Sequence, residues 1–386
     1  MAMTAWISKF DERLTVTPPL GDEQLSQIPA RRGVVALLAD GDEPIVLMTA
    51  GDIRARVRTR LQQPVEGASR KSADLRRITR GVAWTLAAGH FETDLRFLVL
   101  ARAMWPSRYA GMLAWKPAWF VHVDVDEKYP HFSATRKVFA APGRCFGPFA
   151  GERAAQRFLE AIQDGFDLCR DYRCLCRSPD AERCTYGQMG KCLSPCDGSI
   201  GMSDYKMVVA EAAEFAAGRR DEFRGEIEQR MRAAAEGLEF ELAAREKARL
   251  DRLSDVEAAQ FEHVRPAEEF RFILVQRAAK VAQAKVFLVD RGKIAEPAPI
   301  DYPPKRDQLE GLLAEMRVMA GGAFKCGDEE RWQIALVAGY LFSSERRRGL
   351  IVRWHENLGA DELAAAIEDA RELLSLRPPR KRPKTG

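Results

Sequence analysis

The chain has 386 residues, of which 46% are hydrophobic and 30% charged, a balance that excludes disordered and fibrous proteins. A single core rarely serves more than about 250 residues, so this length predicts several domains. The net charge of +4 is small for the size, so any contact with nucleic acid must come from local clusters of basic residues.

The sequence has no apolar run of about eighteen residues, and its amino terminus has neither a basic nor an apolar leader segment. We therefore expect a cytoplasmic protein with no membrane contact.

Two short apolar runs within residues 33–48 flank the turn sequence Asp-Gly-Asp-Glu at residues 40–43, which predicts a β-hairpin. An amphipathic helix follows, because Asp52 can cap it and Ile53, Val57 and Leu61 recur every four residues with arginines between them. Residues 94–105 predict a second helix, and residues 117–125 predict a strand that completes the sheet. The first domain is therefore expected to be α+β and to cover residues 1–141.

Residues 142–204 are interpreted as a linker, in which a helix from Glu152 to Gln163 leads into a cluster of cysteines. Residues 205–260 contain neither proline nor strand-like alternation up to about residue 256, which predicts a long helix or a helical hairpin. The expected breaks are at Gly218, Gly225 and Gly237.

The rest of the chain predicts a small α+β domain over residues 261–376. Its elements are a hairpin at 285–294, a helix at 307–319 and a strand at 348–354. The last ten residues, 377–386, form a basic tail without an acid, which is expected to be disordered and available to phosphate. The fold class of the whole chain is therefore α+β.

Six of the eight cysteines fall within twenty-eight residues, which favours a metal site over disulfides in a chain without a secretion signal. Cys184, Cys192 and Cys196 are spaced to share one metal centre. The candidates for a fourth ligand are Cys169, Cys174 and Cys176. Judged by the residues alone, the simplest interpretation is a structural zinc site with four thiolates.

The segment from CFGPFAGERAAQRFLEAIQDGFDLC through CTYGQMGKCLSPCDGSI to SDY resembles the part of the UvrC excinuclease family that joins the GIY-YIG nuclease domain to the UvrB-binding helices. The resemblance implies a four-iron four-sulfur cluster in place of zinc. Its ligands would be Cys184, Cys192 and Cys196, with Cys169 as the fourth and Cys174 or Cys176 as alternatives to it.

The helical region contains the spacing of the UVR motif, through which UvrC and UvrB bind one another. The matching residues are Met231, Ala234, Ala235, Leu238, Phe240, Glu241, Ala243, Ala244 and Leu253. The resemblance implies UvrB or another UVR-containing protein as the partner, with Met231, Leu238, Phe240, Glu241 and Ala244 at the contact. Phe240 is expected to be an exposed anchor.

Residues 31–61 resemble the layout of a GIY-YIG domain, but most of the residues that carry the chemistry of that family are replaced. The two family tyrosines fall on Val35 and Val46, the second glycine on Met48 and a lysine on Thr49. Only Arg56 matches the catalytic arginine. The metal-binding glutamate falls near Ala101. A rebuilt site would need Mg or Mn and the alternatives Tyr109, Glu92 and Asp94.

Arginines on the first helix and after it form a basic patch that can neutralise DNA phosphates, although a merely solvated face is the simpler interpretation. The patch comprises Arg54, Arg56, Arg58, Arg60, Arg70, Lys71, Arg76, Arg77 and Arg80.

Three functions compete. The favoured one is a DNA-repair protein of the UvrC type, related to nucleotide excision repair, that binds DNA and UvrB with little or no incision activity. The second is an active, metal-dependent endonuclease of the GIY-YIG type that makes a single incision. The third is an RNA-binding or structural protein built around a metal knot. No helix-hairpin-helix or RNase H-like region is recognised after the UVR helices, so the second incision activity of the family is not expected.

Overall fold

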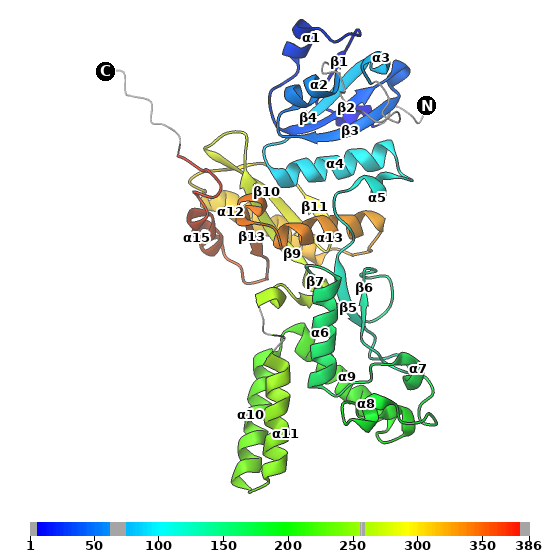
Figure 1. The fold of residues 1–386 in the computed structure, drawn as a ribbon. Helices are drawn as coiled ribbons and strands as arrows, with labels where there is room; N and C mark the ends of the chain where they lie inside the picture. The colour runs from blue at the N-terminus through cyan, green and yellow to red at the C-terminus, as the bar shows by residue number, and fades with distance from the viewer. Residues whose placement is uncertain (1–5, 62–74, 255, 257–258, 379–386) are drawn as a thin grey trace, which may run out of the picture.

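The computed structural model describes residues 6–61, 75–254, 256 and 259–378. Within this part the chain is α+β, as predicted, and its strands form three sheets. Figure 1 shows the N-terminal domain at one end, the C-terminal domain beside it, and the middle domain with a projecting helical hairpin at the other end. None of the described helices is long and apolar enough to cross a membrane.

The first sheet has the order β1-β4-β2-β3 and belongs to the N-terminal domain. Its strands are β1 (Glu12–Thr15), β2 (Gly33–Leu38), β3 (Pro44–Ala50) and β4 (Gly81–Leu86). The predicted hairpin is confirmed as β2 and β3, which pair antiparallel. Its turn needs positive φ at Gly41 (68°) and Asp42 (64°), residue types that adopt this conformation readily.

Helices cover both faces of this sheet. One face packs against α1 (Asp22–Gln27) and α2 (Ile53–Leu61), and the other against α4 (His90–Met104), with α3 (Leu75–Ile78) and α5 (Tyr109–Met112) as short additions. The predicted first helix is confirmed as α2, and the Asp52 carboxylate accepts the Ala55 N–H at 2.9 Å. The second predicted helix is α4, which begins four residues earlier than expected.

The prediction that residues 117–125 complete the first sheet is wrong. Strand β5 (Trp119–Val123) lies in a second sheet of order β6-β5-β7-β8, with β6 (Ser133–Thr135), β7 (Arg144–Phe149) and β8 (Arg265–Pro266). Alternating apolar residues predict a strand but not its neighbours, which here are supplied by later segments. The N-terminal domain therefore ends before residue 118, and the middle domain continues to β8.

The middle domain contains the predicted helical region. Its helices are α6 (Glu152–Gly165), α7 (Tyr172–Leu175), α8 (Thr185–Gln188), α9 (Met202–Ala217), α10 (Arg220–Glu236) and α11 (Phe240–Ser254). The breaks at Gly218 and Gly237 are confirmed, and Gly218 ends α9 with a left-handed φ of 114°. Gly225 lies inside α10 and breaks nothing.

The C-terminal domain is built on a third sheet of order β11-β10-β9-β13, with β12 pairing with β10. Its strands are β9 (Arg271–Arg277), β10 (Gln283–Asp290), β11 (Lys293–Ala295), β12 (Ile300–Asp301) and β13 (Leu350–Arg353), and its helices are α12 (Arg306–Gly321), α13 (Asp328–Leu341), α14 (Glu345–Arg348) and α15 (Ala360–Asp369). The predicted hairpin, helix and strand are confirmed as β10–β11, α12 and β13. The predicted basic tail lies outside the described residues from 379 onward.

A central apolar cluster joins the three domains. Phe91 of α4, Phe120 of β5 and Phe287 of β10 are all fully buried in it, together with Tyr340 of α13. The Phe91 ring lies 4.9 Å from the Phe287 ring and 5.1 Å from the Tyr340 ring, both edge-on. Because aromatic rings bury large areas, this cluster holds the domains in one arrangement.

We predict that Phe287→Ala lowers the free energy of unfolding by about 3–5 kcal/mol, because it leaves a cavity where three domains meet. Val318→Ala is the control, since Val318 is 77% exposed on α12 and should change stability by about 0.5 kcal/mol or less. Urea denaturation followed by tryptophan fluorescence measures both. Equal effects of the two substitutions would contradict a central role for the cluster.

Candidate nuclease face, cysteine cluster and hairpin tip

The positions of the two nuclease signatures form part of an apolar core. Val35 and Met48 lie opposite each other in the register of β2 and β3, and both are buried against α2. Val46 packs against the same core. Arg56 lies on α2 outside this core and is exposed. Signature positions that should offer polar atoms to a phosphate therefore offer only hydrocarbon.

The two acidic alternatives are already engaged on α4. Glu92 is 7% exposed and accepts the Ala88 N–H at 2.8 Å. Asp94 accepts a hydrogen bond from the Tyr340 hydroxyl at 2.6 Å and one from the Arg347 guanidinium at 3.1 Å. Tyr340 and Arg347 belong to the C-terminal domain, so Asp94 serves a contact between domains.

Tyr109 is bound in the same way, because its hydroxyl donates to Asp328 and its ring lies 6.2 Å from that of Trp332. Burial is the main cause that raises the pKa of Tyr109, and the hydrogen bond to Asp328 raises this pKa further. Ala101, at the position of the family glutamate, is fully buried. Helices α4 and α5 lie across the first sheet from Arg56, so the structure does not bring these residues together.

The arginines of α2 do not play one role. The Arg54 guanidinium donates to the backbone carbonyls of Ile28 at 2.6 Å and Ser26 at 2.9 Å, and so holds the end of α1. This geometry gives Arg54 a structural role, and its predicted DNA contact stays a prediction. The remaining arginines of the helix, all exposed, are Arg56, Arg58 and Arg60.

The second half of the predicted basic patch lies on α3, where Arg77 is exposed and Arg76 half-buried. Arg80 donates to the Arg77 carbonyl at 2.8 Å. Arg70 and Lys71 lie outside the described residues. The described part of the patch therefore extends over α2 and α3.

Two distant segments bring Cys169 and Cys192 together. The Cys169 N–H donates to the Tyr205 hydroxyl at 3.0 Å, and the Leu193 N–H donates to the Asp167 carbonyl at 2.9 Å. The Cys169 thiol donates to the Asp171 carbonyl at 3.4 Å, and its interaction with the Cys192 thiol lowers the pKa of Cys192 and raises that of Cys169. The sequence pattern does not mark Tyr205 as a residue of this site, apart from its place in the SDY triplet.

Cys196 and Cys184 complete the cysteine cluster, defined here as Cys169, Cys184, Cys192 and Cys196. The Cys184 N–H donates to the sulfur of Cys196, which is fully buried, and burial raises the pKa of Cys196. Cys192 and Cys196 both act electrostatically on Cys169, so these three cysteines lie near one another although they come from separate segments. An all-thiolate donor set suits zinc and iron–sulfur clusters alike.

Cys174 and Cys176 lie apart from this cluster, on α7 and directly after it. The exposed Cys176 thiol donates to the Arg173 carbonyl at 3.4 Å, and the Arg177 guanidinium lies 3.9 Å from the sulfur of Cys174. This arrangement favours Cys169 as the fourth member. Within the described residues, no three cysteine, histidine or acidic side chains are already arranged to hold a metal ion.

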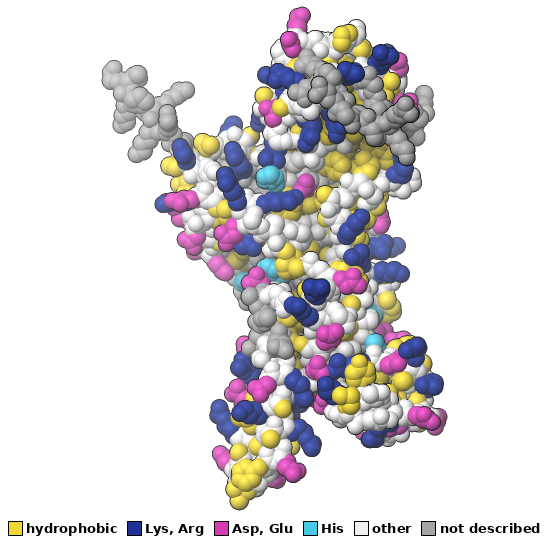
Figure 2. All heavy atoms as spheres, in the orientation of Figure 1, with side chains coloured by type: hydrophobic (Ala, Val, Ile, Leu, Met, Phe, Trp, Pro, Cys, Tyr) yellow, Lys and Arg dark blue, Asp and Glu magenta, His cyan; other side chains and the backbone are white. Residues whose placement is uncertain are grey.

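The helical hairpin of α10 and α11 is anchored at its base and free at its tip. At the base, Leu253 is buried so close to Gly165 that a Cβ there would lie 2.2 Å from it. At the tip, Leu238 is 71% and Phe240 67% exposed, and Figure 2 shows hydrophobic side chains gathered at this free end. The predicted exposure of Phe240 is confirmed. The other predicted contact residues are the exposed Glu241 and Ala244 and the half-buried Met231.

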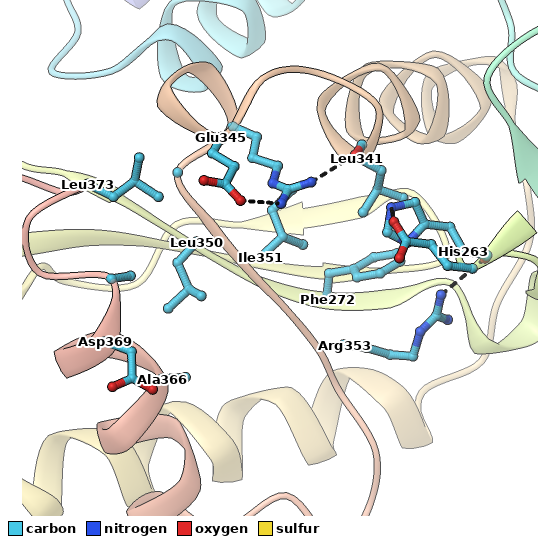
Figure 3. A pocket seen from close by; sticks show the side chains of 14 residues that line it. His263, Phe272, Leu341, Glu345, Leu350, Ile351, Arg353, Ala366, Asp369 and Leu373 are labelled. Atoms are coloured by element: carbon cyan, nitrogen blue, oxygen red, sulfur yellow. Dashed lines mark hydrogen bonds and ion pairs between the residues drawn. The ribbon is translucent and has the colours of Figure 1, made fainter. Parts of the chain in front are cut away.

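A cavity of about 610 Å³ lies at the outer edge of β13 in the C-terminal domain (Figure 3). Its charged groups already have partners: Arg348 pairs with Glu345 at 3.6 Å, and Arg353 donates to the His263 carbonyl at 3.1 Å. Burial lowers the pKa of Arg353 to about 10. These satisfied side chains leave little positive charge for a ligand.

Comparison with known proteins gives a match to one family model. The model of the "UvrC/Cho excinuclease, middle domain" matches residues 118–215, which run from β5 to α9. No solved structure gave a significant match.

Curated relatives carry the name UvrABC system protein C. That of Hyphomonas neptunium is 26% identical over 70% of this chain and 44% of its own length. That of Ruegeria sp. is 27% identical over 67% of this chain and 41% of its own length. That of Trichlorobacter lovleyi is 38% identical over 32% of this chain and 20% of its own length.

The chain thus spans less than half the length of these relatives. The matches to two of them extend over about two thirds of the chain, well beyond the middle domain. Together with the match of the middle domain, they show that this α+β chain is similar to UvrC-family proteins over about two thirds of its length.

Proposed function

We propose that this protein acts in nucleotide excision repair in the cytoplasm, as a UvrC-like protein that binds DNA and UvrB and makes little or no incision itself. The observation that carries the proposal is the apolar core at the nuclease signature positions, Val35, Val46 and Met48. A GIY-YIG nuclease needs a tyrosine to position water, an arginine to stabilise phosphate charge and a carboxylate to hold a divalent metal. Of these three groups, only the arginine has a matching residue in this chain, which is Arg56.

We predict that duplex DNA binding and DNA cutting separate in this protein. The Arg56→Ala/Arg58→Ala variant should bind less tightly and flatten the salt dependence by about one unit per lost phosphate contact. Incision should be absent at saturating protein with Mg or Mn, with and without UvrB. The measurements are fluorescence anisotropy with a labelled duplex and a nicking assay on supercoiled plasmid.

Metal-dependent nicking that vanishes in Arg56→Ala would overturn the proposal and establish the active single-incision endonuclease in its place. The Arg56→Ala protein, purified in the same way, is the control for contaminating nucleases.

The hairpin tip supports UvrB as the protein partner. Leu238 and Phe240 expose large apolar surfaces on a helical projection whose sequence resembles the UVR motif. A single aromatic ring buried in a helix-on-helix contact can supply much of the affinity of such an interface. The hairpin base is held by α6, so the tip is presented at a defined distance from the core.

We predict that Phe240→Ala weakens UvrB binding by about 2 kcal/mol or more, roughly thirtyfold, because it removes the central anchor. The control is Met207→Ala, which removes an apolar side chain that is 59% exposed on α9. Isothermal titration calorimetry with purified UvrB measures both. If Phe240→Ala binds as tightly as Met207→Ala, the tip is not the interface.

The cysteine cluster supports a resident four-iron four-sulfur cluster held by Cys169, Cys184, Cys192 and Cys196, with zinc as the alternative. Three of these cysteines are buried. A metal at this place would link the end of α6 to the start of α9, and its binding energy would be folding energy for the middle domain.

We predict that protein purified without oxygen is brown and contains iron, and that Cys192→Ser loses the iron and much of its stability. Cys326→Ser should keep both, since Cys326 lies in the C-terminal domain away from the cluster. Cys174→Ser tests the alternative ligand and should also keep the iron. Metal analysis that finds stoichiometric zinc without iron would contradict the assignment.

A further inference from the structure

A cavity of about 310 Å³ opens where the N-terminal domain meets the C-terminal domain. Arg31 and Arg32, before β2, line it from one domain, and Arg277, at the end of β9, lines it from the other. The remaining walls are small residues: Ala30, Gly51, Ala87, Ala88, Ala278 and Ala279. Small walls leave the arginines as the groups that a ligand would meet first.

The two domains approach closely at this place. A Cβ at Gly89 would lie 2.4 Å from the Oε1 atom of Gln276. Gln276 lies in β9, directly before Arg277. Glycine at residue 89 therefore permits the contact that brings Arg277 opposite Arg31 and Arg32. The cavity exists only in the assembled arrangement of both domains.

The arginines of this cavity have no acidic partner among the described residues. Within the part of the chain that the structure describes, the Arg32 guanidinium contacts the Nδ1 atom of His90 at 3.2 Å, while Arg31 and Arg277 are exposed. Glu92 and Asp94 of α4 are bonded to Ala88, Tyr340 and Arg347 as described above, and Asp52, next to Gly51, accepts the Ala55 N–H. Unpaired guanidinium groups converging on one space are typical of sites for phosphate.

The electrostatics of His90 agree with this geometry. Burial lowers the pKa of His90, and Arg32 and Arg347 lower it further, while Asp94 on the same helix opposes them. A histidine that feels two arginines in this way lies in a region of positive potential. Figure 2 shows Lys and Arg side chains gathered over this junction of the two domains.

We propose that this interdomain cavity, defined by Arg31, Arg32 and Arg277, is a binding site for the backbone phosphates of duplex DNA. The inference rests on the proposed function and deepens it, because it gives the DNA a second contact that the C-terminal domain helps to form. The cavity at β13 differs, since its arginines are already paired with Glu345 or with backbone carbonyls. A role in DNA binding follows for a domain whose sequence alone indicates none.

The test compares two triple variants in a salt titration with a labelled duplex. Arg31→Ala/Arg32→Ala/Arg277→Ala should lower the affinity at low salt by about tenfold or more and flatten the salt slope by about one unit per lost phosphate contact. The control, Arg153→Ala/Arg232→Ala/Arg317→Ala, removes the same charge from exposed positions elsewhere and should change far less. Equal losses in both variants would overturn the proposal, because net charge alone would then explain the effect.

A second measurement uses the wild-type chain and so does not depend on the folding of a variant. NMR titration of His90 should give a higher pKa with saturating duplex than without it, because a phosphate near the imidazolium stabilises the charged form. In the Arg31→Ala/Arg32→Ala/Arg277→Ala variant, the loss of Arg32 should raise the pKa of His90 before DNA is added. Duplex should then raise the pKa of His90 no further. An unchanged His90 pKa at saturating duplex would contradict the proposed site. A shift of this pKa with inorganic phosphate but not with duplex would contradict it as well.

These outcomes also separate the two proposals. Wild-type protein that binds no duplex refutes DNA binding altogether. Wild-type protein that binds duplex equally well with and without the three cavity arginines refutes only this site.

Discussion

The packing of α4 between two sheets is the contact on which the rest of the structure depends. Its Leu98 and Ala101 pack on the first sheet, while Phe91 and Leu95 enter the cluster shared with the C-terminal domain. A helix buried on both sides has few side chains left for other work. The polar side chains of α4 that face the C-terminal domain join the two domains. Arg96 of α4 pairs with Glu296 of the C-terminal domain at 2.7 Å, and Lys285 of β10 pairs with the same carboxylate at 3.3 Å.

This use of α4 determines what the acids near the nuclease signature positions contact. A metal-binding carboxylate must point into an open face with the arginine on the same side. In this chain Glu92 and Asp94 point toward the C-terminal domain, and the opposite face of the sheet is filled by Val35 and Met48. The same packing creates the basic cavity, because it holds β9 against the start of α4.

The middle domain organises its two features around one helix. Helix α6 carries Gly165 against the hairpin, where the Arg249 guanidinium donates to its carbonyl at 3.0 Å. The next residue, Phe166, packs its ring 5.6 Å from Phe215 of α9 and 6.2 Å from Phe223 of α10. Cys169 lies three residues after Phe166 in the sequence. Any order that a metal imposes on Cys169 would therefore reach the base of the hairpin and stiffen the direction of its tip.

Local pattern determined much of this protein. The hairpin of β2 and β3, the capped helix after Asp52, the breaks at Gly218 and Gly237 and the exposure of Phe240 all follow from residue type and spacing within a few residues. The replacement of the nuclease signature residues is also visible in the sequence, since valine has no polar atom wherever it lies. Cys184, Cys192 and Cys196 were recognised because they lie close together in the chain.

Only the tertiary structure decided which segments meet. It moved residues 119–123 from the first sheet to the second, turned Arg54 toward the carbonyls of α1, and chose Cys169 over Cys174 as the neighbour of Cys192. It also set Arg277 opposite Arg32, more than two hundred residues away in sequence. No periodicity announces such pairs, because strand partners and domain contacts are selected by the burial of surfaces that lie far apart along the chain.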